Sequence, residues 1–344
     1  MKIQKIKEKL KSEEYDFLRT NEHLGSNIIL LGLGGSYAYG TNTENSDIDV
    51  RGCALNSKRE ILVPGCNFDQ VTEEKTDTTV YSFNKLISLL TNCNPNTIEI
   101  LGLKPEHYLY VHPIGQQLID NSGMFLSKKA VYSFGGYATS QLRRLDNKAA
   151  RSLEQTERMN HVLNSIKNAF YTFPEKYFSF PEEAINFYVD KSEQENYDSE
   201  VFMDINLKHY PLNDYAGMWA EMKAIVKDYS KIGKRNKHAI EHDKLGKHMC
   251  HLVRLYYMCF DILEKGKIIT YRENEHDLLM DLRNGKYLDS NYQPISEFFE
   301  LVDELEKKLK YDAENTSLPD KPNYKEIEEF SASINEKVIL GEER

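Results

Sequence analysis

The sequence predicts an α+β protein, with a mixed sheet flanked by helices in its N-terminal part and a mainly helical part after it. Residues 27–36, "NIILLGLGGS", contain a short apolar run that ends in glycines, which is typical of a buried strand entering a tight turn. Residues 46–55 alternate between polar and apolar side chains, with the period of a half-buried strand. From about residue 125 the apolar side chains recur at helical spacing instead. We therefore expect a boundary near residues 115–130.

The other elements of the N-terminal part follow from the same patterns. An amphipathic helix is expected over residues 3–20, a third strand over 76–83 and a helix over 82–93. Pro95 then either breaks that helix or occupies the first turn of the next one.

The C-terminal part contains three clear helical patterns, over residues 130–150, 246–266 and 323–339. Residues 170–215 are aromatic and irregular, and they predict no definite element.

Composition and charge exclude some functions. The 344 residues suffice for two domains, and the net charge of −10 argues against a dedicated duplex binder, although a local basic pocket for one nucleotide or an RNA end remains compatible with it. No apolar run is long enough to span a membrane, and the charged N-terminal segment lacks the apolar core of a secretory signal. The five scattered cysteines fit reduced thiols. These features predict a cytoplasmic protein without a membrane partner.

The stretch "GGSYAYGTNTENSDIDVRG", residues 34–52, carries the clearest chemistry. Asp47 and Asp49 stand at i and i+2 in the expected strand, so both carboxylates should project from one face. Oxygen ligands of this kind suit Mg²⁺ or Mn²⁺, and a pair of such ions can clamp the two oxygens of a phosphoryl displacement. The glycine turn lets backbone N–H groups approach a phosphate, and the Ser36 hydroxyl adds a donor.

Two other phosphate-binding motifs do not fit this stretch, and a simpler interpretation exists. Tyr37 stands where a dinucleotide fingerprint needs its third glycine, and no Gly-Lys-Ser/Thr follows as in a Walker loop. Asp-x-Asp by itself is common, and the glycines could form only a strand-ending turn. The combination indicates more: a strand, Gly-Ser, about ten residues, and then Asp-Ile-Asp.

That order resembles the signature of the polymerase-β-like nucleotidyltransferase superfamily. The closer similarity is to nucleotidyltransferases of the YcgL type, including the RNA-repair-associated, RlaP-like branch. "DTTVYSFNKLISLLTNCNPNTIEIL" resembles their strand, helix and NPN segment, and "GGYATSQLRRL", "KHMCHLVRL", "RNGKY" and "LPDKPNY" resemble their helical half. The similarity covers most of the chain. It implies a catalytic nucleotidyltransferase domain over residues 1–120 and a mainly helical domain over 121–344 that binds nucleotide or acceptor.

The resemblance also implies roles for three carboxylates. Asp47 and Asp49 match the metal-binding pair, with Mg²⁺ or Mn²⁺ as the cofactor. Asp77, at the start of the third strand pattern, matches the third carboxylate, which acts as base toward the attacking hydroxyl and touches one metal. Glu74 is the alternative if the strand register differs. Gly35 and Ser36 of the glycine turn would hold the β- and γ-phosphates of the nucleotide.

Other side chains near the motif have two interpretations each. Arg51 could neutralise phosphate or orient Asp49, or it could form an ion pair behind the site. Asn94, Asn96 and Glu99 surround the NPN turn, where they could line the nucleotide or acceptor site, although an Asn at such a turn commonly caps a helix.

In the helical part, Lys247, His251 and Arg254 fall at i, i+4 and i+7, on one helix face. The resemblance favours a cationic stripe that binds the triphosphate, and a solvated helix face is the alternative. The family pattern has an acidic residue two positions before the lysine, where this chain has Leu245. A zinc site at His248, Cys250 and His251 is not favoured, because the spacing matches no common structural zinc site.

The resemblance predicts an enzyme that transfers a nucleoside monophosphate from an NTP to a hydroxyl and releases pyrophosphate. RNA 3′ ends, a protein hydroxyl, another nucleotide and a small molecule are all open as acceptors, and RNA repair is favoured by analogy alone. The alternatives are a non-catalytic nucleotide-binding module and a synthase of a nucleotide second messenger. The base preference and the oligomeric state are not visible in the sequence.

Overall fold

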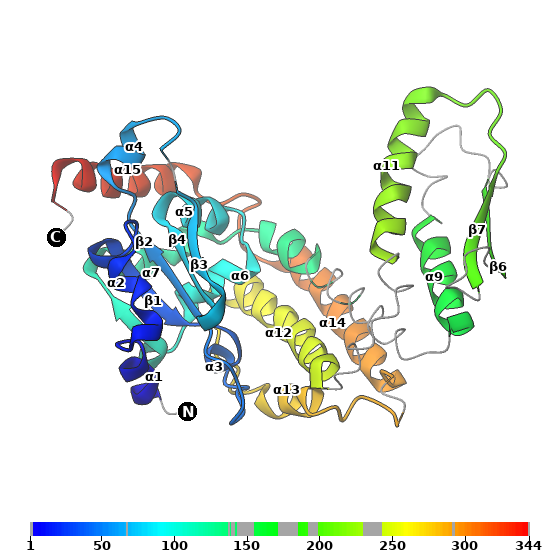
Figure 1. Cartoon of the computed structure of the whole chain (residues 1–344), viewed down its shortest axis with the longest axis horizontal. Helices are drawn as coiled ribbons and strands as arrows, with labels where there is room; N and C mark the ends of the chain where they lie inside the picture. Colours follow the sequence, from blue (N-terminus) through cyan, green and yellow to red (C-terminus); the bar gives the residue numbers. More distant parts are fainter. Residues whose placement is uncertain are drawn as a thin grey trace. The chain divides into compact units, whose positions relative to one another are not determined.

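The computed structural model is mixed α/β in its N-terminal part and mainly helical in its C-terminal part, which confirms the predicted fold class (Figure 1). The structure describes residues 3–66, 68–136, 138, 142, 155–170, 185–191, 199–229, 243–290 and 293–342.

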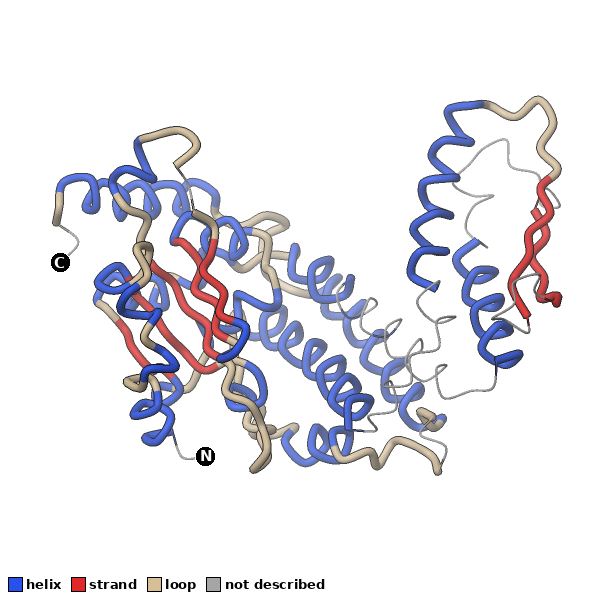
Figure 2. Tube along the Cα trace, in the orientation of Figure 1, coloured by secondary structure: helices blue, strands red, loops and turns tan. Residues whose placement is uncertain are grey.

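A mixed five-stranded sheet forms the centre of the N-terminal part. Its strands are β1 (Ile28–Leu33), β2 (Val50–Ala54), β3 (Gln70–Glu73), β4 (Thr78–Ser82) and β5 (Tyr108–Val111). The order across the sheet is β3-β4-β2-β1-β5, in which β2 and β4 run parallel and the other neighbours run antiparallel. Figure 2 draws the strands in red. The sequence correctly predicted β1, β2 and β4 as strands.

The helices vary from single turns to more than six turns. In chain order they are α1 (Ile3–Lys9), α2 (Phe17–Thr20), α3 (Gly35–Tyr39), α4 (Lys58–Leu62), α5 (Phe83–Thr91), α6 (Pro95–Ile98), α7 (Pro113–Asp120), α9 (Gln155–Phe170), α11 (Leu212–Tyr229), α12 (Asp243–Lys265), α13 (His276–Arg283), α14 (Ser296–Asn315) and α15 (Tyr324–Leu340). Short 3₁₀ turns cover Glu13–Tyr15, Gly25–Asn27, Glu74–Thr76, Glu99–Gly102, Pro105–His107 and Ser122–Phe125.

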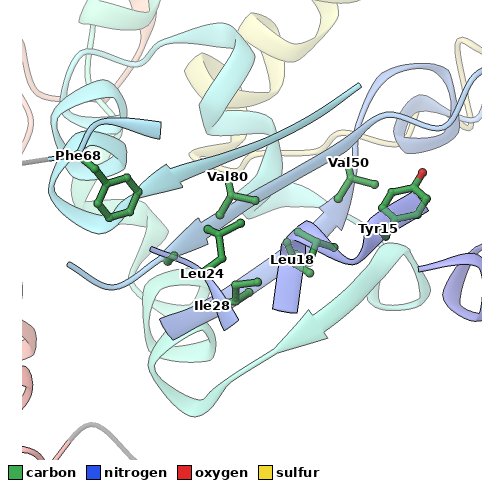
Figure 3. Packing of buried hydrophobic residues seen from close by; sticks show 9 residues of the cluster. Tyr15, Leu18, Leu24, Ile28, Val50, Phe68 and Val80 are labelled. Atoms are coloured by element: carbon green, nitrogen blue, oxygen red, sulfur yellow. The ribbon is translucent and has the colours of Figure 1, made fainter. Parts of the chain in front are cut away.

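One apolar cluster packs the N-terminal segment onto the sheet (Figure 3). The cluster consists of Tyr15, Leu18, Leu24, Ile28, Leu31, Val50, Ala54, Phe68 and Val80. All six residues of β1 are buried because both faces of this strand are covered, and α7 packs against it. A strand buried on both faces reads as a continuous apolar run, which explains why the sequence signal for β1 was an uninterrupted run without alternation.

Several predicted elements have different bounds in the structure. The helix expected over residues 3–20 is interrupted after Lys9, and a 3₁₀ turn precedes α2. The strand expected over residues 46–55 begins only at Val50, so Asp47 and Asp49 lie in the segment before β2. Of the helix expected over residues 130–150, residues 130–136 are helical and most of the remainder lies outside the described residues.

Residues 170–215, for which the sequence predicted no definite element, contain a β-hairpin in their described part. Strands β6 (Ile185–Lys191) and β7 (Ser199–Ile205) pair antiparallel. Ile185 and Phe187 of this hairpin join a core with Met159 of α9 and Met218 of α11.

The chain forms two compact units. Unit 1 comprises residues 1–140, 249–284 and 296–344, and unit 2 comprises residues 141–248 and 285–295. Helices α13, α14 and α15 therefore belong with the sheet, and compactness does not divide the chain at residue 120. Separate functions for residues 1–120 and 121–344 stay a prediction.

The described helices include none that combines the length and the apolar character needed to cross a membrane.

Candidate active site

The candidate site lies in unit 1, at the edge of the sheet where β2 and β4 begin. Because these strands are parallel and Val50 is in register with Thr78, the residues that precede them, Asp49 and Asp77, are neighbours. The Val50 N–H donates to the Asp77 carbonyl oxygen at 3.1 Å, which continues the pairing by one residue. Two acidic residues that are 28 positions apart in the chain therefore meet side by side.

The glycine turn after β1 lies directly against Asp49. The Gly34 N–H donates to the Asp49 carbonyl oxygen at 2.8 Å. Gly35 has φ +54°, and a Cβ placed there would come within 1.6 Å of the Asp49 Oδ2 atom. A side chain at position 35 is thus excluded twice, by the backbone conformation and by the carboxylate. The glycine turn and Asp49 are therefore in direct contact, as the order of the motif suggested.

Arg51 of β2 fastens Asp77 in place. Its guanidinium donates to the Asp77 carbonyl oxygen at 2.6 Å and to the Asp77 Oδ1 atom at 3.0 Å. Of the two interpretations of Arg51 from the sequence, the structure has the ion pair, although its partner is Asp77 and not Asp49. Its predicted role in nucleotide binding stays a prediction.

The two carboxylates share a hydrogen bond, and this shifts their pKa values in opposite directions. Burial, the bond to Asp77 and the negative charges of Asp77 and Asp47 raise the pKa of Asp49 to about 7, with Arg51 opposing the shift. The hydrogen bond from Asp49 lowers the pKa of Asp77 most. Burial opposes this shift, and the charge and hydrogen bond of Arg51 add to it. A protonated Asp49 therefore donates to an ionised Asp77 near neutral pH.

Asp47 and Glu74 are placed differently from this pair. Asp47 is exposed and acts on Asp49 through its charge. Glu74 is an exposed residue of the 3₁₀ turn that ends at Thr76, and the carboxyl group that bonds Asp49 is that of Asp77. The described residues include no group of three or more His, Cys, Asp or Glu side chains arranged to hold a metal ion.

The donor chemistry of the pair nevertheless suits a divalent cation. Asp49 and Asp77 present oxygen ligands only, and the proton that they share is the charge compensation that two adjacent carboxylates need. Hard cations such as Mg²⁺ or Mn²⁺ prefer such oxygens. Binding of a cation would release that proton.

A buried polar network holds the other end of α3. The Tyr39 hydroxyl donates to Glu99, and Arg254 donates to the Glu99 Oε2 atom at 3.1 Å. The Arg254 guanidinium also stacks on the Tyr39 ring, with its carbon 3.4 Å from the ring centroid. The Thr270 hydroxyl donates to the Glu99 carbonyl oxygen at 2.6 Å. Sequence reasoning missed this network because its members come from four distant segments and no local pattern connects them.

The three residues predicted as a cationic stripe do not form one exposed face. Arg254 is 2% exposed and paired with Glu99, and Lys247 is exposed and belongs to unit 2. The His251 Nδ1 atom lies 2.8 Å from the Arg254 guanidinium, which can only donate, so this nitrogen accepts. A helical period predicts which side chains share a face and does not predict whether that face is buried. Nucleotide binding by these residues stays a prediction.

The remaining predicted residues have these positions. Ser36 is half-buried in the first turn of α3, next to Gly35. The Asn94 side chain accepts from the Asn96 N–H at 3.0 Å and caps α6, with Pro95 in the first turn, so the capping interpretation is confirmed.

The paired carboxylates predict a measurable pH dependence of stability in the metal-free protein. Because the pKa of Asp49 is raised from 3.8 to about 7, the folded state holds a proton that the unfolded state releases, and stability should fall as pH rises from about 4 to 7. Asp49→Asn removes this dependence, so the variant should gain roughly 2–4 kcal/mol relative to the wild type between pH 4 and pH 8. Urea unfolding in a chelator at several pH values measures the difference.

Added Mn²⁺ provides the control for this prediction. At pH 8 it should stabilise the wild type and leave Asp49→Asn nearly unchanged, because the variant lacks the carboxylate. Parallel stability curves for the two proteins from pH 4 to pH 8 would contradict the shared proton.

Comparison with known proteins gives one family match. Residues 4–173 match the family model described as RlaP, RNA repair pathway DNA polymerase beta family. The matched range contains the glycine turn, Asp47, Asp49 and Asp77. No curated protein and no solved structure matches the chain.

Proposed function

The chain belongs, through residues 4–173, to a polymerase-β-like nucleotidyltransferase family of RNA repair, and from this premise we propose that it transfers a nucleoside monophosphate from an NTP to a hydroxyl. Pyrophosphate is the leaving group, and the hydroxyl at an RNA end is the favoured acceptor. The observation that carries the proposal is the Asp49–Asp77 pair against the Gly34–Gly35 turn. This arrangement places oxygen ligands beside a backbone that a phosphate can approach closely.

The cofactor of this proposal is Mg²⁺ or Mn²⁺, held by Asp47, Asp49 and Asp77. When bound, the ion would supply positive charge to the reacting phosphoryl group and lower the pKa of the attacking hydroxyl. Asp47 is exposed on the segment before β2, so its side chain can reach a ligand without breaking a buried contact.

The chain's own residues would accept the proton, contact the phosphates and position the base. The hydrogen bond from Asp49 and the ion pair with Arg51 keep Asp77 ionised, so it can accept the proton of the attacking hydroxyl at neutral pH. The Gly35 and Ser36 backbone at the start of α3 lies on the Asp49 side of the site and would contact the phosphates of the nucleotide. Arg51 keeps Asp77 in place through two hydrogen bonds and so acts as a positioning residue.

The experiment that tests the function is a transfer assay with each of the four α-labelled NTPs in the presence of Mg²⁺ or Mn²⁺. Parallel reactions contain an RNA with a 3′ hydroxyl, an RNA whose 3′ end is blocked, an unrelated protein, or no acceptor. Label on the hydroxyl-ended RNA and not on the blocked RNA supports the proposal. A labelled product without an acceptor indicates a messenger synthase, and NTP binding without any labelled product indicates a non-catalytic module; either result contradicts the proposal.

A further inference from the structure

The arginines of unit 1 differ in the charge of their partners. Arg51 pairs with Asp77, Arg254 with Glu99 and Arg272 with Asp261, each at 2.6 to 3.1 Å.

Arg283, the last residue of α13, differs from these arginines. Its guanidinium donates to the Ser46 hydroxyl at 3.1 Å, and no carboxylate among the described residues pairs with it. It is half-buried. A half-buried cation held by a neutral hydroxyl retains most of its capacity to bind an anion, because no ion pair has to break first.

The contact of Arg283 lies next to the candidate metal ligands. Ser46 directly precedes Asp47, and its hydroxyl also accepts from the Thr43 N–H at 2.8 Å. The end of α13 thus contacts the segment that contains Asp47 and Asp49 and leads into β2. Arg283 also acts on the Cys250 thiol through its charge, and Cys250 bonds the Thr41 side chain at the start of the same segment. Arg283 therefore faces the segment between α3 and β2 from the helical part of unit 1.

We propose that Arg283 binds the anionic polyphosphate chain of the nucleotide. This inference rests on the proposed function and specifies which cation of the chain takes the phosphates. The guanidinium has five N–H donors, of which one contacts Ser46, and its planar fork matches two phosphate oxygens. Arg51 and Arg254 are less suited to this role, because each would first have to leave a carboxylate.

The test uses inorganic tripolyphosphate with saturating Mg²⁺ as the probe, and calorimetry on the full chain as the measurement. Arg283→Gln should weaken tripolyphosphate binding by roughly tenfold or more, and Arg283→Lys should recover part of it, because the charge returns without the fork. Arg59→Gln is the matched control: it removes an exposed arginine from α4, at the other end of unit 1 from α13 (Figure 1), and should leave the affinity unchanged.

Ser46→Ala separates anion binding from simple support of the loop. It removes the contact and leaves the cation, so the affinity for tripolyphosphate should stay within about twofold of the wild type, whereas Arg283→Gln should lower it. The inference is overturned if Ser46→Ala and Arg283→Gln both leave the affinity for tripolyphosphate unchanged. It is also overturned if both variants lower only the affinity for Mn²⁺ measured in a separate titration, because Arg283 would then only support the loop.

The outcomes also separate this inference from the proposed function. Arg283-dependent tripolyphosphate binding in a protein that labels no acceptor would retain the anion site and refute the transfer activity. Transfer with an unchanged KM for NTP in Arg283→Gln would retain the activity and refute the anion site.

Discussion

Asp49→Asn is expected to lower nucleotidyl transfer by about 10³-fold or more. Asp49 supplies an oxygen ligand for the proposed cation and lies against the glycine turn, so its replacement removes the charge that holds the ion beside the phosphates. Single-turnover assays with the labelled NTP and acceptor that the wild type uses measure this effect. The side chain of Asn has the same shape as that of Asp, so the Gly35 contact remains possible.

The fold of the Asp49→Asn variant should persist, and this makes the activity loss informative. Since burial and neighbouring negative charges raise the pKa of Asp49, the ionised group is a source of instability in the metal-free protein, and its neutral replacement should be at least as stable at pH 8. Asp69→Asn is the matched control, because Asp69 is an exposed aspartate that pairs with Lys85. It should retain full activity. Transfer by Asp49→Asn at a rate near that of Asp69→Asn would contradict the assignment of Asp49 as a ligand of the proposed cation.

Glu99→Ala is expected to destabilise the protein by roughly 3–5 kcal/mol. The change leaves the Arg254 guanidinium, 2% exposed, without its carboxylate, and it removes the acceptor of the Tyr39 hydroxyl. An uncompensated buried charge costs far more than the hydrogen bond itself. Equilibrium urea unfolding of the full chain measures the loss.

Two further variants show whether burial is the cause. Asp69→Ala breaks an ion pair of the same length, 3.1 Å, whose side chains are 68% and 36% exposed, and it should cost less than about 1 kcal/mol. The double variant Glu99→Gln, Arg254→Met removes both charges and should recover much of the stability that Glu99→Ala loses. Equal losses from Glu99→Ala and Asp69→Ala would show that the buried network has no special role.

The elements that the sequence predicted well are those with a strong local signal. The apolar run of β1, the alternation within β4 and the periodicity of α5, α12 and α15 all reflect burial of neighbouring residues, which local spacing reports directly. The bounds of β2 were wrong at Asp47 and Asp49, because polar alternation continues through an extended segment whether or not it joins a ladder. The β6–β7 hairpin had no clear signal, since its aromatic residues fit several element types.

In the candidate site, too, some features follow from local sequence and others depend on tertiary structure. The order of Gly34, Gly35, Asp47 and Asp49 is a property of one short stretch, so the sequence alone identified it, together with its resemblance to nucleotidyltransferases. The choice between Asp77 and Glu74 depended on strand register. Only the parallel pairing of β2 with β4 decided that Asp77 is the neighbour of Asp49.

The sequence by itself determined the fold class, the glycine turn and the Asp47–Asp49 motif, because each is encoded in the spacing of neighbouring residues. Only the tertiary structure decided which arginine side chains are paired with a carboxylate. Arg254 and Arg283 are both arginines of helices. Arg254 is buried against Glu99, whereas Arg283 contacts the neutral hydroxyl of Ser46, the residue before Asp47. The physical reason is that the charge available to a ligand depends on partners contributed by distant segments, and no local period records them.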